Sequence, residues 1–124
     1  MLMSVKEVFL DLVSYSTGSD ETTRTTPSTP GQKVLGAHIV EHMKKIGIED
    51  AYMDDLGYVY GTIPANDPRK NTVGFIAHID TYGGVSGENI QPQIIENYDG
   101  STIVLGESGL TLSPEAFPAL KDHI

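Results

Sequence analysis

The 124-residue sequence contains no cysteine, no tryptophan and no apolar run long enough to cross a membrane. The absence of cysteine excludes a disulfide framework and thiol chemistry, and apolar runs well short of about 18 residues exclude a transmembrane helix. Basic residues are also scarce, because eight lysines and arginines stand against 17 acidic residues, for a net charge of −9. This charge balance argues against nucleic acid and anionic membranes as partners.

The amino-terminal segment also lacks the features of a secretory signal. A signal peptide has a basic start and an unbroken apolar stretch, whereas here Lys6 is the one basic residue and Glu7 and Asp11 interrupt the apolar residues. Hydrophobic residues make up 39% of the chain and charged residues 20%, the composition of a globular domain. We therefore expect a cytoplasmic protein of one domain's length.

A first amphipathic helix is predicted near the amino terminus. Ser4 and Glu7 fit a capping box, in which the hydroxyl accepts from an amide of the first turn and the carboxylate accepts from the capping residue's own amide. Apolar residues then recur at helical spacing, at Val5, Val8, Phe9, Leu12 and Val13. This helix is expected to end before Gly18, and the polar residues 17–28 are expected to form a loop.

A second amphipathic helix is predicted after this loop. Thr29 and Gln32 fit a second capping box, with Pro30 at the first helical position, where its missing N–H has no cost. Gly47 marks the expected end of the helix. The apolar stripe consists of Leu35, Ile39, Met43 and Ile46.

Two hairpins and a buried strand are predicted in the rest of the chain. Residues 51–53 and 58–63 flank a turn at residues 54–57 and form the first hairpin. Residues 93–98 and 101–105 flank Asp99-Gly100, the dipeptide that favours a type I′ turn, and form the second.

The nearly continuous apolar run at residues 72–79 is typical of a strand buried on both faces of a sheet. Residues 113–115 are expected to start a further helical turn that Pro118 interrupts. The predicted fold class is therefore α/β, a mixed sheet flanked by helices, with the strand at residues 73–77 in its centre.

The strongest candidate for chemistry stands where this predicted strand ends. His78 and Asp80 are two residues apart, so both side chains point to the same side of a strand. A metal-binding imidazole usually donates its second ring N–H to a carboxylate, which fixes its tautomer and orientation. A histidine followed two residues later by an aspartate is common, so the motif alone favours the other interpretation, a polar cap on a strand end.

Five stretches of the sequence, taken in order, resemble the start of the peptidase T family, tripeptide aminopeptidases of the M20-type metallopeptidases. The stretches are PSTPGQ at 27–32, IPAN at 63–66, GFIAHIDT at 74–81, SGENIQPQIIENYDG at 86–100 and LSPEAFP at 112–118. The resemblance extends over nearly the whole chain. It implies a cytosolic enzyme that uses two zinc ions to remove the N-terminal residue from tripeptides.

The resemblance also implies roles for the His-x-Asp motif. His78 matches the family's first metal ligand, and Asp80 matches the acidic residue that holds this imidazole, which assigns it to the catalytic machinery. The family's other ligands and its general base are expected beyond Ile124. Residues 1–124 are therefore expected to be the N-terminal portion of a zinc-exopeptidase catalytic domain, inactive without the remainder and without the inserted dimerisation or lid domain.

A second histidine motif lies on the second predicted helix. His38, Glu41 and His42 spell H-x-x-E-H, the inverted zincin motif, in which two histidines bind zinc and the glutamate is the base. Such a site needs a third ligand from a distant helix. At about 100° per residue, both histidines fall at the border between the apolar stripe and the solvent face, which is typical of surface histidines.

A different class of function stays open at this point. A non-catalytic fragment or degenerate relative would act only in self-association or binding. An incomplete sheet leaves an edge and apolar surface uncovered, which favours a homo-oligomer. The two classes are separated by whether the gene continues in frame past Ile124 with an Asp-Asp and a Glu-Glu motif.

Overall fold

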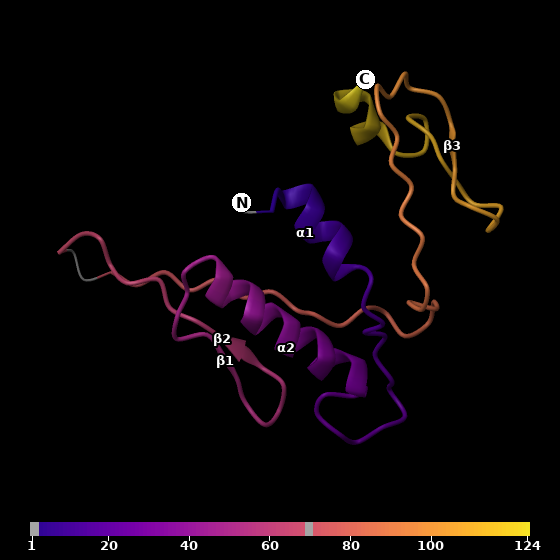
Figure 1. The fold of residues 1–124 in the computed structure, drawn as a ribbon. Helices are drawn as coiled ribbons and strands as arrows, with labels where there is room; N and C mark the ends of the chain where they lie inside the picture. The colour runs from indigo at the N-terminus through magenta and orange to yellow at the C-terminus, as the bar shows by residue number, and fades with distance from the viewer. Residues whose placement is uncertain (1–2, 69–70) are drawn as a thin grey trace. The chain divides into compact units, whose positions relative to one another are not determined.

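A computed structural model describes residues 3–68 and 71–124 of the chain. These residues fall into two compact units, Met1–Ile90 and Gln91–Ile124. The first contains two helices and a two-stranded sheet, and the second contains a two-stranded sheet and a 3₁₀-helix (Figure 1). The predicted mixture of helices and strands is confirmed at this level. Within the described residues, no helix is long and apolar enough to cross a membrane.

Helix α1 spans Val5–Leu12 and begins with the predicted capping box. The Ser4 amide donates to the Glu7 carboxylate over 2.7 Å, and the Glu7 amide donates to the Ser4 hydroxyl over 3.3 Å. The bond from the Ser4 amide, followed by that from its hydroxyl, lowers the pKa of Glu7. Because each partner satisfies a donor that the helix cannot satisfy, these local bonds account for the start of α1.

Helix α2 spans Pro30–Lys45, but the capping box predicted for its start is wrong. The Thr29 side chain forms no capping bond, and its hydroxyl donates to the Gly18 carbonyl over 2.9 Å. The Gln32 side chain also turns away from its own helix, toward the preceding loop. The physical reason is competition, since carbonyls of that loop offer both side chains acceptors outside the helix. Gly47, at φ +99°, follows the helix end as predicted.

Strands β1, Tyr52–Met53, and β2, Val59–Tyr60, form the first predicted hairpin, although each is shorter than expected. The Asp54 carboxylate closes the turn by accepting from the Leu56 and Tyr58 amides over 3.0 and 2.9 Å. The rings of Tyr52 and Tyr60, which are paired across the strands, stack at 5.2 Å.

The hairpin packs against α2 in the first unit (Figure 1). Gly36 allows this approach, because a Cβ there would meet the Met53 sulfur at 2.6 Å. Among the residues that the structure describes, the buried apolar side chains are Leu35, Val40 and Ala51. Ile46, predicted as part of the apolar stripe, is 46% exposed at the end of the helix.

The predicted central strand at residues 72–79 is wrong. These residues are irregular, and Phe75 and Ile76 are almost fully exposed, at 94% and 102%. A strand buried on two faces requires hydrogen-bonded neighbours and covering layers. Among the described residues, the sheet contact nearest to this segment is one isolated parallel bridge, between Gly18 and Thr81. The apolar composition of this run therefore predicts a buried strand, whereas its side chains are largely exposed in the structure.

The second predicted hairpin is also wrong in its pairing. Strand β3, Ile103–Val104, pairs with the following strand β4, Thr111–Leu112, and not with residues 93–98. Gly106 and Gly109, at φ +53° and +73°, supply the left-handed backbone that the short connection needs. The position of the hairpin is therefore set by the two glycines of this connection and not by the Asp99-Gly100 dipeptide.

The segment around Asp99 forms a local turn of its own. The Asp99 carboxylate accepts from the Ser101 amide over 2.9 Å, and the Tyr98 hydroxyl donates to the Ser101 carbonyl over 2.8 Å. Beyond β4, residues 114–116 form the predicted turn. Pro118 does not interrupt a helix but begins the 3₁₀-helix η1, Pro118–His123, because proline is well tolerated in a first helical turn.

Candidate functional site

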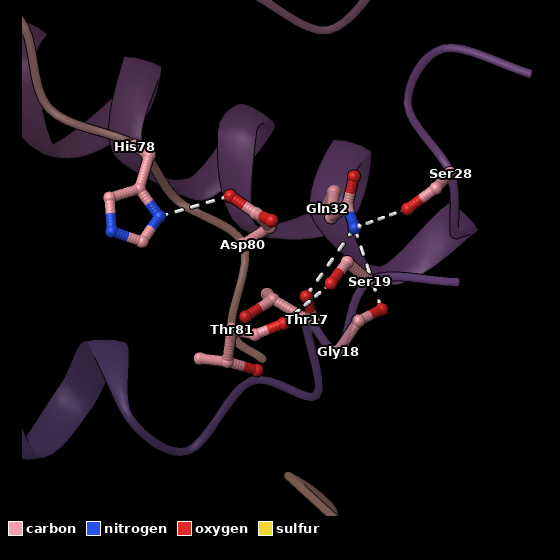
Figure 2. Close-up of polar contacts among 8 residues, drawn as sticks. All are labelled: Thr17, Gly18, Ser19, Ser28, Gln32, His78, Asp80 and Thr81. Atoms are coloured by element: carbon pink, nitrogen blue, oxygen red, sulfur yellow. Dashed lines mark hydrogen bonds and ion pairs between the residues drawn. The ribbon is translucent and has the colours of Figure 1, made fainter. Parts of the chain in front are cut away.

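The two residues of the His-x-Asp motif lie side by side in the first unit, as Figure 2 shows. The Nδ1 atom of His78 is 3.0 Å from the Asp80 carboxylate. The His78 side chain is 84% exposed and the Asp80 side chain 45% exposed. The expected proximity of the two groups is thus present although the expected strand is not.

This arrangement presents one ring nitrogen to a carboxylate and leaves the other available. When Nδ1 carries the proton and donates it to Asp80, the lone pair of Nε2 points away from the carboxylate. In that tautomer an imidazole can bind a metal ion through Nε2. Among the described residues, no group of three or more His, Cys, Asp or Glu side chains gathers around it.

The backbone just beyond Asp80 is held by a neighbouring segment of the chain. The Thr81 amide donates to the Thr17 carbonyl over 3.1 Å, and the Ser19 amide donates to the Thr81 carbonyl over 2.9 Å. The Ser19 hydroxyl donates to the same Thr81 carbonyl over 3.0 Å. The two amide bonds form the parallel bridge between Gly18 and Thr81, and the hydroxyl bond reinforces it. Together they hold the backbone directly after Asp80.

A hollow of about 870 Å³ lies beside the pair, between α2, the β1–β2 hairpin and residues 75–80. Its apolar wall includes Ile39, Met43 and Tyr60, and its lining extends to His78 and Asp80. Desolvation, followed by the charge of Asp54, raises the pKa of Tyr60 above its ordinary value. A mostly apolar hollow with a few polar groups at one end is the usual form of a small-ligand site.

The other histidine motif has a structural role that the sequence does not reveal. His38 Nε2 lies 2.5 Å from the Asp11 carboxylate, and its ring lies 4.9 Å from that of Tyr15. The side chains of His38 and Asp11 are 28% and 32% exposed, which agrees with the predicted position of His38 at the border of the solvent face. Asp11 belongs to α1 and His38 belongs to α2, so this contact joins the two helices. A nitrogen engaged with Asp11 is not available to a zinc ion.

Replacement of the two helix histidines one at a time should therefore have unequal effects. His38→Gln is expected to lower the free energy of unfolding by about 1–2 kcal/mol, because it removes a partly buried bond to a charged group. His42→Gln is expected to change it by no more than about 0.5 kcal/mol, the usual range for a site without such a bond. Urea denaturation of both variants and of Asp11→Asn measures the difference. Equal effects of His38→Gln and His42→Gln would contradict the assigned role of the Asp11 contact.

The sequence did not predict the contacts of two buried residues, Gln32 and Thr17, next to the His78 segment. Gln32 of α2 is 6% exposed, and Thr17, whose carbonyl it contacts, is 3% exposed. A glutamine in the first turn of a helix matches a capping box equally well, so the sequence carries no signal that separates the two roles.

Comparison with known proteins shows extensive similarity to one enzyme. The chain is 46% identical over 125 residues to peptidase T of Bacillus subtilis, an alignment that covers 99% of this chain and 30% of the relative. The chain matches the N-terminal part of peptidase T. It is also 48% identical to peptidase T of Bacillus licheniformis over 90% of its own length and 28% of the relative.

Peptidase T of Clostridium perfringens is likewise 48% identical, over 96% of this chain and 29% of the relative. The resemblance drawn from the five sequence stretches is confirmed by these matches. The chain spans about 30% of the length of the peptidase T proteins that it matches. No model of a protein family matches it.

Proposed function

We propose that this chain is the N-terminal portion of the catalytic domain of a di-zinc aminopeptidase that removes the first residue from tripeptides. The observation that carries the proposal is the 3.0 Å contact between His78 Nδ1 and the Asp80 carboxylate, in a chain that matches peptidase T throughout. The relatives of this chain carry the name peptidase T, and this name supports a hydrolase that acts on peptides. We place the complete enzyme in the cytoplasm and in the M20-type metallopeptidases.

The donor set fits one position of a zinc site. His78 supplies a nitrogen ligand of the kind that zinc prefers, and Asp80 is placed to hold its ring and proton. Zinc in such enzymes polarises the scissile carbonyl and lowers the pKa of a bound water molecule. In this proposal Asp80 acts on the imidazole and not on the substrate, and the other ligands, the general base and the lid domain come from the remainder of the protein.

The test uses the full-length protein that carries this chain. His78→Ala is expected to remove bound zinc and tripeptide hydrolysis together, because the variant loses a metal ligand. Asp80→Asn keeps the size of the side chain but removes its charge, and should weaken zinc binding or activity about 10–100-fold, as loss of a supporting carboxylate does.

Zinc affinity is measured by competition with a chromophoric chelator, and activity by release of the N-terminal amino acid. His42→Ala is the matched control for a histidine outside the site, and Glu115→Gln is the control for an exposed carboxylate. Zinc binding and turnover that stay unchanged in His78→Ala would exclude this residue as a ligand and overturn the proposal.

Self-association is the second candidate function, and one observation favours it. Val73, Phe75 and Ile76 are 73%, 94% and 102% exposed and stand close together in the sequence. Exposed apolar side chains of this kind are typical of surfaces that associate. Analytical ultracentrifugation of the chain and of its Ile76→Lys variant tests this function, because only a self-associating chain would shift toward monomer on substitution.

A further inference from the structure

Gln32 is a buried polar side chain that has no place in the proposed chemistry. It lies in the first turn of α2 and is 6% exposed. Its amide nitrogen is 3.1 Å from the Ser28 hydroxyl, 3.4 Å from the Thr17 carbonyl and 3.5 Å from the Gly18 carbonyl (Figure 2). The two longer bonds are weak individually. Together these two bonds hold the Gln32 amide group against the loop backbone at residues 17 and 18.

The start of α2 touches this loop at two further points. The Thr29 hydroxyl donates to the Gly18 carbonyl over 2.9 Å, so this oxygen accepts from two side chains of the helix start. A Cβ on Gly31 would overlap the Ser16 carbonyl, so the absence of a side chain allows direct backbone contact. Residues 16–18 are therefore held against the first turn of α2 by hydrogen bonds and by close packing.

The opposite side of the same loop holds the backbone that follows Asp80. The Thr81 carbonyl accepts from the Ser19 amide and hydroxyl, and a Cβ on Gly83 would overlap the Ser19 carbonyl. The Thr17 carbonyl accepts both from the Thr81 amide and from Gln32. A carbonyl has two lone pairs, so this one oxygen joins the helix contact to the contact with the His78 segment.

We propose that Gln32 is a positioning residue for the His78–Asp80 pair, acting through residues 17–19 and Thr81. This inference rests on the proposed function only where it concerns zinc. The side chains from residue 73 to residue 78 are exposed, so packing does not orient this segment. The bridge lies one residue beyond Asp80 and three beyond His78. Loss of the Gln32 bonds should therefore loosen the bridge and widen the range of His78 orientations.

Gln32→Met is the variant that tests this role, since it keeps the length and volume of the side chain and removes its donors. In the full-length protein, we expect amide hydrogen exchange of Ser19 and Thr81 to quicken at least about tenfold, while amides in the middle of α2 keep their protection. Zinc affinity should fall about tenfold, at the lower end of the range for residues that support a metal ligand. Gln93→Met is the matched control, because Gln93 accepts from the Gly106 amide in the second unit.

Unchanged exchange at Ser19 and Thr81 in Gln32→Met would overturn the positioning role. Should that variant fail to fold, Thr29→Val decides in its place, since it removes only the bond to Gly18 and should quicken exchange at Ser19 and Thr81 in the same direction. Faster exchange without any change in zinc affinity would overturn the link from the bridge to the pair. If His78→Ala binds zinc normally, the proposed function fails, whereas the exchange measurements still judge the role of Gln32 in holding the bridge.

Discussion

The 124-residue chain alone is expected to hydrolyse no tripeptide, with or without added zinc. A catalytic zinc ion needs about three protein ligands and a water molecule, and a two-metal site needs more. In the described part of the chain, His78 is 84% exposed and no three ligand side chains gather. One exposed imidazole cannot retain zinc against buffer ligands at micromolar metal concentration.

The measurement is an assay of the purified chain on a tripeptide, with zinc titrated from none to an excess. The chain with His78→Ala serves as the control, because it separates turnover at this site from that of a contaminating peptidase. Turnover in the chain that disappears in His78→Ala would show that these residues suffice, for example through a site shared between two copies. The ligand count that supports the expectation would then be wrong.

The largest expected loss of stability comes from Gly31→Ala. The added methyl group would overlap the Ser16 carbonyl, and neither a backbone carbonyl nor the first turn of a helix can move as a flexible side chain does. We expect the free energy of unfolding to fall by about 3 kcal/mol, the upper end for an overpacked site. Urea denaturation followed by circular dichroism measures the change.

Gly18→Ala is the matched control for this prediction. Gly18 belongs to the same contact, yet a Cβ there would find open space within 4 Å and its backbone is not left-handed. Its replacement is expected to change stability by no more than about 0.5 kcal/mol. A similar loss in Gly18→Ala and Gly31→Ala would show that the cost arises from glycine itself and not from the contact with Ser16.

Features that depend on neighbours in the sequence were predictable. The capping box of Ser4 and Glu7 uses donors and acceptors within one helical turn. The hairpin between β1 and β2 depends on the Asp54 carboxylate, which closes its own turn. The His78–Asp80 contact belongs to the same group, because residues two apart in an extended chain face the same side. In each of these cases the stabilising partner lies within a few residues.

Features that depend on distant partners were not predictable. The apolar run at residues 72–79 carries the composition of a buried strand, but composition does not specify which segments cover it. The sequence of Gln32 and its neighbours fits a capping box, yet its amide contacts Ser28 and also Thr17 and Gly18, about fifteen residues away along the chain. The pairing of the second hairpin was not predicted, because Gly106 and Gly109 allow the chain after β3 to turn back onto β4.

The stacked tyrosines of the β1–β2 hairpin give the first unit a built-in optical probe. The chain has six tyrosines and no tryptophan, so tyrosine dominates its near-ultraviolet absorption. Two phenol rings held at 5.2 Å and tilted by 25° couple their electronic transitions, and this coupling disappears when the strands separate. Near-ultraviolet circular dichroism of Tyr52→Phe, compared with the parent chain, would isolate this signal and report hairpin opening without an attached dye.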